Sequence, residues 1–432
     1  MVETAPMTEL STPLNLPLPP AHQSDQTPAP PVPWAIIAGL SLAALGSGVS
    51  LRLADALLPR LAREFQISLG QASQVITAFA VAYGLSQLLF GPLGDRYGKV
   101  RVIGWACAAS AGASLLCAWA PNHPALVAAR LLAGASAAAV IPLAMAWIGD
   151  QVAYERRQAV LARFLIGQIS GFAIGVSAGG YAAEHLDWRT PFYGLAVLFL
   201  LISLILQGLR WRLPTGAVAP ARAGGPAARA GLWAEFRAVL ALPWARTVLL
   251  TVFCEGASVY GPFAFLATHL HLRFGLPLST VGGLVMGFAL GGLGFAVASQ
   301  TLVRRLGERA LVRSGALIMA AALLTVALAP VWWWAVPACA AFGLGFYMLH
   351  NTLQTQATQM APERRGAAVA AFASCFFLGQ SAGVGLAGLL VGVIGTGWLM
   401  PIGAAGVLAV AWRYNRAQRH PGPATAAPAG SA

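Results

Sequence analysis

Long apolar runs alternate with short polar segments along most of this chain, and the pattern predicts membrane-spanning helices. Each run is close to the ~20 residues that an α-helix needs to cross the hydrocarbon layer. Twelve such runs occur, over about 35–58, 72–91, 101–120, 125–148, 163–183, 191–209, 247–270, 280–302, 311–329, 332–354, 367–392 and 397–413. The predicted fold class is an all-α integral membrane protein with twelve transmembrane helices.

The segments outside these runs are polar or low in complexity. Residues 1–33 contain nine prolines and no Lys or Arg, which predicts a disordered tail and excludes a cleaved signal peptide. Residues 213–243 are rich in Pro, Gly, Ala and Arg and are predicted to be a connector. The apolar residues Leu232, Trp233, Phe236 and Leu240 follow helical spacing there, which fits a short helix in the membrane interface or a solvated linker.

The chain also repeats itself. Residues 154–159 recur as 362–367, 208 positions later, and a weaker copy of the segment around 93–99 follows at 302–308, offset by 209. We interpret this as two six-helix halves in pseudo-twofold parallel repeat. The predicted units are a tail (1–33), a first half (34–212), a connector (213–243), a second half (244–413) and a second tail (414–432).

Composition and charge agree with a membrane protein. The chain is 58% hydrophobic and only 9% charged, and its net charge of +13 is spread over alternate loops. That spread is typical of membrane topology and excludes a nucleic-acid-binding patch. If both termini are cytoplasmic, 21 of the 27 Lys and Arg residues lie on the cytoplasmic side, against four on the other. The five cysteines are scattered, so we expect neither a disulfide nor a metal site.

One charged stretch stands between the second and third apolar runs. It reads G-x-L-G-D-R-x-G-K-x-R and resembles the signature loop of the major facilitator superfamily of secondary transporters. The resemblance implies a conformational latch on the cytoplasmic side, with the glycines allowing sharp turns and close approach. The residues assigned to the latch are Gly91, Gly94, Asp95, Arg96, Gly98, Lys99 and Arg101, with Asp150 as a companion.

Two further segments are similar to motifs of the twelve-helix drug:proton antiporter branch of this family. Asp55 and Pro59 resemble its acidic motif in helix 1. The helix 5 motif is matched by Gly171, Gly175, Gly179 and Gly180. Val176 stands where that motif has a proline, a departure that weakens the assignment to antiport.

Ionisable residues inside a membrane are costly and usually functional. Four occur here: Arg52, Asp55, Arg130 and Glu255. Arg52, Asp55 and Arg130 share the outer third of the membrane, so we expect Asp55 to pair with Arg130 or Arg52. The alternatives are that Asp55 reaches water, that Arg52 extends to lipid phosphates, and that Arg130 is a structural clamp between helices.

Proton coupling is assigned to Glu255, Asp55 and Arg130, with Glu255 as the principal proton carrier. Glu255 lies eight residues into the seventh apolar run, 247–270, which places it about 12 Å deep at ~1.5 Å per residue. No basic residue lies within two helical turns of it in sequence. Desolvation should favour its protonated form. The tenth apolar run, 332–354, carries polar side chains that are predicted to form a wall of the substrate cavity. Alternatively, His350 in this run is a packing residue. The wall consists of Tyr347, His350, Asn351 and Gln354, and Arg52 is assigned to the same substrate cavity.

These features predict a proton-coupled secondary transporter that exports a small organic molecule by alternating access. The alternative is an importer of a nutrient or metabolite with the same proton site. No clustered constellation of an enzyme and no nucleotide-binding motif is evident, so we expect no enzymatic activity, metal or cofactor, and the proton gradient as energy source. The expected partners are the substrate, protons and the lipid bilayer; the expected state is a monomer in a bacterial inner membrane.

Overall fold

The computed structural model describes residues 33–152, 154–211 and 232–418, and the regular structure in these ranges is entirely helical. In chain order the elements are α1 (Trp34–Arg52), α2 (Leu58–Glu64), α3 (Leu69–Ala72), α4 (Gln74–Tyr97), α5 (Lys99–Ala118), α6 (His123–Ala137), α7 (Val140–Gln151), α8 (Tyr154–His185), α9 (Thr190–Trp211), α10 (Leu232–Ala241), α11 (Pro243–Phe274), α12 (Leu278–Val285), α13 (Gly287–Leu328), η3 (Trp332–Trp334), α14 (Ala335–Gln359), η4 (Pro362–Arg364) and α15 (Arg365–Ala417). The predicted tail 1–33, except Pro33, lies outside the described residues, as do 212–231 of the connector region and the end of the second tail.

Ten helical stretches in the described chain are long and apolar enough to cross a membrane. Two of them are much longer than one crossing requires and are broken internally. Gly307 interrupts α13 with φ 70°, and Gly395 interrupts α15 with φ 74°. Positive φ is readily adopted only by glycine, so these two residues are where the chain can turn back.

Several predicted spans contain breaks that the apolar pattern did not reveal. The predicted span 35–58 is wrong as a single helix, because residues 53–57 form turns between α1 and α2. Pro59 in the first turn of α2 explains the break, because it has no N–H to bond the carbonyl of Asp55 and its ring would clash with that carbonyl in a continuous helix. Pro142 explains the gap between α6 and α7, because it lacks the N–H that would bond the carbonyl of Ala138.

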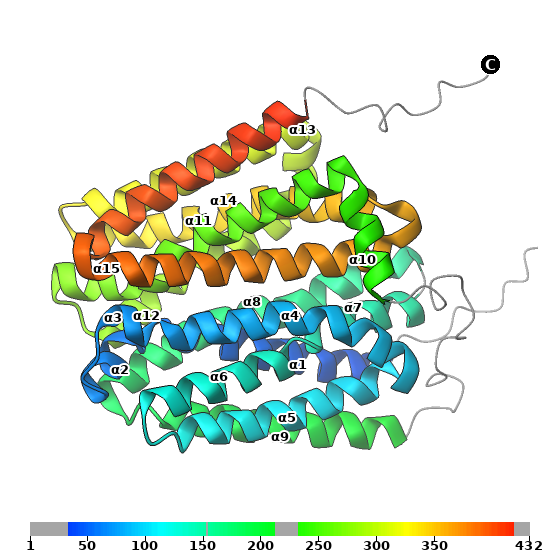
Figure 1. Ribbon diagram of the computed structural model, residues 1–432, viewed down its shortest axis with the longest axis horizontal. Coiled ribbons are helices and arrows are strands. Elements are labelled where there is room, and N and C mark those ends of the chain that lie inside the picture. The colour runs from blue at the N-terminus through cyan, green and yellow to red at the C-terminus, as the bar shows by residue number, and fades with distance from the viewer. Residues whose placement is uncertain (1–32, 153, 212–231, 419–432) are drawn as a thin grey trace, which may run out of the picture. The chain divides into compact units, whose positions relative to one another are not determined.

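The long helices lie side by side, with their axes close to horizontal in Figure 1. Within the first part of the chain, α1 packs on α8 and α9, α4 on α6, and α5 on α6 and α9. Within the second part, α11 packs on α15 and α13 on α14. The two groups meet where α4 contacts α15 and where α8 contacts α12.

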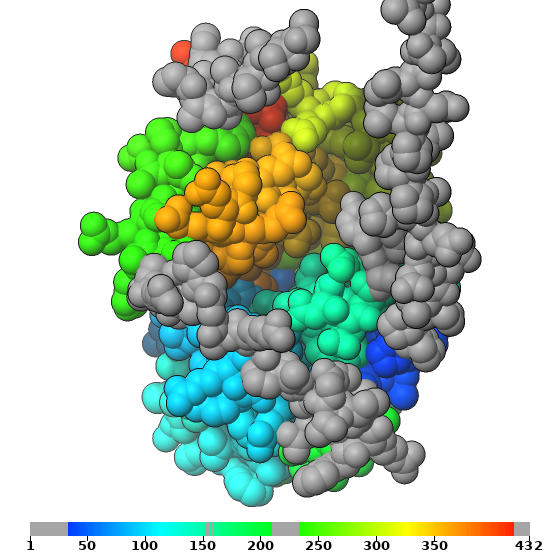
Figure 2. Space-filling view, turned by 90° about the vertical axis from the view of Figure 1, so that its right-hand side faces the viewer, coloured from blue at the N-terminus to red at the C-terminus, as the bar shows by residue number. Residues whose placement is uncertain are grey.

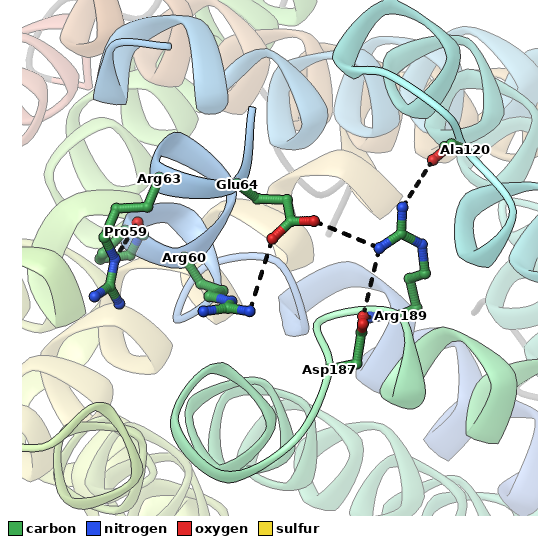
Figure 3. Close-up of polar contacts among 7 residues, drawn as sticks. All are labelled: Pro59, Arg60, Arg63, Glu64, Ala120, Asp187 and Arg189. Carbon is green, nitrogen blue, oxygen red and sulfur yellow. Dashed lines mark hydrogen bonds and ion pairs between the residues drawn. The ribbon is translucent and has the colours of Figure 1, made fainter. Parts of the chain in front are cut away.

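Arginines at the end of the bundle opposite to the α4–α5 turn are bound by neighbouring oxygen atoms (Figure 3). Glu64 at the end of α2 pairs with Arg60 at 3.7 Å and with Arg189 at 3.6 Å. Arg189 also pairs with Asp187 and donates to the carbonyl of Ala120 at 3.4 Å. These contacts tie three separate turns of the first part of the chain together.

The connector contains the short helix that the apolar spacing predicted, now observed as α10. Trp233 is 77% exposed, whereas Val239 is buried. Glu235 of α10 forms an ion pair with Arg364 at 3.2 Å, which ties the connector to the segment just before α15. Figure 2 looks onto this end of the bundle, where α10, the α4–α5 turn and the α14–α15 turn lie.

Candidate functional site

Arg52 and Asp55 form a buried ion pair where α1 gives way to turns. Nη1 of Arg52 lies 3.3 Å from Oδ2 of Asp55, and the two residues are only 2% and 1% exposed. The alternatives that Arg52 extends to lipid phosphates and that Asp55 reaches water are therefore wrong for this structure. Nη2 of Arg52 and Oδ1 of Asp55 have no hydrogen-bond partner among the described residues. The pair is thus desolvated but incompletely satisfied, a costly arrangement that usually has a function.

The guanidinium of Arg52 also lies against aromatic rings from other helices. It is 4.0 Å from the ring centroid of Tyr260 and 5.3 Å from that of Phe263, both on α11. Phe172 of α8 lies at 5.5 Å. A cation over an aromatic face is attracted by the ring quadrupole, most strongly where water is excluded. Tyr260 was not singled out in the sequence, because its distance of more than 200 positions from Arg52 gives no local signal.

Arg130 is held by backbone oxygens instead of by Asp55. Its Nε donates to the carbonyl of Val75 at 3.2 Å, and its Nη1 donates to the carbonyl of Ser50 at 3.1 Å. The guanidinium also stacks 4.2 Å from the ring of Phe79. These contacts join α6 to α1 and α4, which favours the interpretation of Arg130 as a clamp between helices.

Glu255 is completely buried and is paired with His350. Oε2 of Glu255 lies 3.1 Å from Nδ1 of His350, which brings α11 and α14 together. Oε1 of Glu255 has no partner among the described residues. The side chain of His350 is 16% exposed, whereas that of Glu255 is 0% exposed. No basic residue lies within two helical turns of Glu255 in sequence, and the imidazole beside it comes from 95 positions further along the chain.

An aromatic cluster lies between these two pairs. The ring of His350 stacks on Phe346 at 5.0 Å and tilts against Phe376 at 4.5 Å. Tyr260, which contacts Arg52, lies 5.8 Å from Phe346 and 5.6 Å from Phe376. The two ionisable pairs are thus connected through the same packed rings.

The remaining residues of the predicted substrate wall differ in exposure. Tyr347 and Asn351 are partly buried, and Gln354 is exposed. The ring of Tyr347 packs against Phe346 and Phe288. Their contact with a substrate stays a prediction.

The signature stretch is organised by Lys99. Its Nζ lies 2.7 Å from Oδ2 of Asp150 and 3.1 Å from Oδ1 of Asp95, so it connects α4, α5 and α7. Gly98 makes the turn between α4 and α5 with φ 90°. A Cβ on Gly94 would lie 2.5 Å from Leu143, so this glycine allows close packing.

Gly91 of the stretch differs from the expectation of a sharp turn or a close approach. Gly91 does not turn the chain, because α4 continues through it to Tyr97, and a Cβ added to it would meet nothing within 4 Å. Arg96 and Arg101 stack on Tyr97 and Trp105 at 5.1 Å and 5.0 Å respectively.

The four glycines of the predicted helix 5 motif lie on α8, against backbone carbonyls of neighbouring segments. A Cβ on Gly171, Gly175 or Gly179 would lie within 2.2–2.8 Å of a carbonyl oxygen of Leu45, Val49 or Leu53. These three glycines let α8 approach α1 and the turns after it. Gly180 faces the other way, because its Cβ would lie 2.3 Å from the carbonyl oxygen of Leu278 on α12.

The contact between α8 and α12 also contains a polar cap that the sequence analysis missed. Glu184 of α8 accepts from the backbone N–H of Ser279 at 3.0 Å and from its hydroxyl. The residue before α12 is Pro277, which has no side-chain acceptor for the free N–H groups of that helix. A helix that begins without a capping side chain needs a hydrogen-bond acceptor from elsewhere in the chain. Pro277 before the apolar run was the sequence signal that such an acceptor is needed.

The histidines near the end of α11 are used for hydrogen bonding. Nδ1 of His269 lies 3.0 Å from the hydroxyl of Thr396, and Nδ1 of His271 lies 2.6 Å from the carbonyl of Leu276. No group of three or more His, Cys, Asp or Glu side chains suited to a metal ion occurs in the described part of the chain.

Comparison with known sequences gives a consistent result. A sequence model of the Major Facilitator Superfamily matches residues 40–384. The uncharacterised MFS-type transporter YceJ of Bacillus subtilis (strain 168) is 27% identical over 349 residues, which are 79% of this chain and 86% of that protein. The puromycin resistance protein pur8 of Streptomyces alboniger is 36% identical over 149 residues, 34% of this chain and 29% of its own. The multidrug export protein EmrB of Escherichia coli (strain K12) is 29% identical over 174 residues, 40% of this chain and 34% of its own.

Solved structures share the fold at low identity. The nucleoside transporter NupG superposes with a TM-score of 0.71 at 14% identity, covering 88% of this chain and 98% of its own. The human organic anion transporter MFSD10 superposes with a TM-score of 0.64 at 18% identity and the same coverage.

Proposed function

Because this chain belongs to the Major Facilitator Superfamily, whose members are transporters and not enzymes, we propose that it is a proton-coupled exporter of a small organic molecule. Transport would proceed by alternating access between two halves of the helical bundle. The observation that carries the proposal is the completely buried Glu255 with His350 at 3.1 Å.

The proposed topology has twelve spans and both termini in the cytoplasm. Splitting α13 at Gly307 and α15 at Gly395 turns the ten long stretches into twelve. The repeat is supported by Gly98 and Gly307, which are 209 positions apart and both adopt positive φ. We place the monomeric chain in a bacterial inner membrane, with the α4–α5 turn in the cytoplasm, as the distribution of basic residues favours.

In this topology we propose that the state described here is closed on the outer side. Gly180 and Glu184 bring α8 against α12 there, and Gly70 approaches the carbonyl of Gly388 on α15. On the cytoplasmic side, Lys99 is bound by carboxylates of the first half. We propose that the cytoplasmic latch between the halves is open in this state.

Proton exchange would occur at Glu255. Glu255 is completely buried, and the imidazole of His350 lies 3.1 Å from its carboxyl group. His350 is partly exposed and Glu255 is not, so the imidazole is placed to pass a proton between water and the carboxyl. Asp55 instead forms a buried ion pair with Arg52 at 3.3 Å.

Export is supported by relatives whose names describe drug export or resistance, although each matches less than half of this chain. The likeness to a nucleoside transporter supports the fold alone. The substrate of this chain is to be found by experiment.

The test is flux in proteoliposomes under an imposed pH gradient, with a panel of dyes, sugars and amino acids. Wild-type protein should accumulate one class only when protons can flow in the opposite direction. Glu255→Gln mimics the protonated carboxyl, so it should abolish this accumulation while substrate binding and exchange persist. Asp55→Asn is the matched control for a second buried carboxylate.

Two results would contradict the proposal. If Glu255→Gln still concentrates substrate and Asp55→Asn does not, Asp55 is the proton carrier. If accumulation follows protons in the same direction, the protein is an importer.

A further inference from the structure

A groove of about 470 Å³ lies between the second segment of α13 and the end of α15. Figure 1 shows the red end of α15 running beside α13, at the end of the bundle that carries the α4–α5 turn. Arg313 contributes one wall, and Trp412 and Arg416 contribute the other. The groove is separate from Glu255, His350 and the Arg52–Asp55 pair.

The groove is basic at its rim. Both arginines are exposed, and no carboxylate is part of its lining. Arg313 has no hydrogen bond or ion pair within the described ranges, and Arg416 stacks 5.4 Å from the ring of Trp412. Two guanidinium groups without an acidic partner create a site where a phosphate group would be favoured.

The other part of the groove is apolar. Leu317, one turn after Arg313 on α13, and Leu408, one turn before Trp412 on α15, line it, and both are exposed, at 51% and 38%. A basic rim that continues into an apolar wall matches a ligand with a phosphate at one end and hydrocarbon at the other. A small soluble anion would gain nothing from the leucines.

We propose that this groove binds an anionic phospholipid, with its phosphodiester between Arg313 and Arg416 and an acyl chain along Leu317 and Leu408. Trp412, 64% exposed, is suited to the headgroup level, where amphipathic rings accumulate. Basic pockets between transmembrane helices are established binding places for such headgroups. The cytoplasmic leaflet follows from the proposed topology, whereas binding itself does not depend on it or on the transported substrate.

The test is native mass spectrometry of the purified full chain in detergent with phosphatidylglycerol or phosphatidylcholine. Wild-type protein should retain phosphatidylglycerol in preference to phosphatidylcholine, and less so at high salt. Arg313→Gln and Arg416→Gln should each weaken phosphatidylglycerol binding about five-fold. The double variant should bind the two lipids alike. Arg304→Gln, an exposed arginine on α13 outside the groove, is the matched control and should bind as wild type does.

Several outcomes would overturn the proposal. The double variant could retain phosphatidylglycerol as wild type does, or Arg304→Gln could lose as much as the groove variants. Inorganic phosphate at equal concentration could displace the lipid, which would indicate a site for free anions. A dimer that the double variant disrupts without any lipid effect would assign the groove to a second copy of the chain.

Discussion

Replacing Gly180 with alanine should shift the protein away from the state described here. The added Cβ would lie 2.3 Å from the carbonyl oxygen of Leu278, whereas ordinary contact begins at 3.4 Å. Helix α12 would therefore have to withdraw from α8 by about 1 Å. Because Glu184 and Ser279 bond across the same contact, that withdrawal would also strain the cap of α12.

Overpacking of this kind costs about 1–3 kcal/mol. If α8 and α12 belong to halves that separate during transport, the cost applies only to the closed state. The ratio of closed to open molecules should then fall about 5- to 150-fold. Gly179→Ala is the sharpest control, because its Cβ would meet the carbonyl of Leu53 at 2.2 Å, within the first half. It should lower the melting temperature without changing this ratio.

The assay is a distance measurement by double electron–electron resonance. Nitroxides on Leu186 and Leu272, both exposed, would report the separation of the two halves at this end. The partly exposed Cys254 and Cys375 would be replaced first. Gly180→Ala should move the population towards longer distances. Gly194→Ala on α9, whose Cβ would meet nothing within 4 Å, controls for the substitution itself.

An unchanged distance distribution in Gly180→Ala would refute the reasoning. So would an equal shift in Gly179→Ala, because the turns after α1 would then be equivalent to α12 as neighbours of α8. The idea of two separating halves would have to be abandoned in the second case.

Two further predictions concern contacts of charged side chains. Tyr260→Leu should lower the rate of transport about 5- to 30-fold, because a desolvated cation–π contact contributes about 1–2 kcal/mol. Tyr260→Phe should keep most of the wild-type rate, because the ring remains. Equal losses of rate in the two variants, measured in flux assays, would assign the effect to the hydroxyl or to packing. Asp95→Asn combined with Asp150→Asn should slow flux while equilibrium substrate binding persists, because Lys99 then loses both carboxylates. Normal flux in that double variant would exclude a latch at Lys99.

Much of the fold could be predicted because apolar runs and glycines act locally. The turn at Gly395 was expected between the last two runs, and α10 follows the spacing of its apolar residues. The break before α2 was missed, although Pro59 was visible, because the composition of 53–57 is as apolar as that of the helix before it. Hydropathy predicts which residues lie in the membrane, whereas hydrogen-bonding geometry determines where a helix ends.

The residues of the site were predictable from the sequence, but only one of its two ionisable pairs was. Burial of Glu255 and the pairing of Arg52 with Asp55 followed from depth and from spacing along one segment. The pairing of Glu255 with His350 depends on how α11 packs against α14, which no local pattern encodes. The same holds for Tyr260 beneath Arg52.

The backbone contacts of Arg130 have a consequence for sequence variation. A carbonyl oxygen is supplied by every amino acid, so the positions of Ser50 and Val75 can change without losing the hydrogen bonds they accept. Only their size is restricted, since both are buried. Arg130, by contrast, reaches two carbonyls with two arms of one planar group, which lysine cannot imitate. Among natural variants we therefore expect an invariant arginine surrounded by positions that drift.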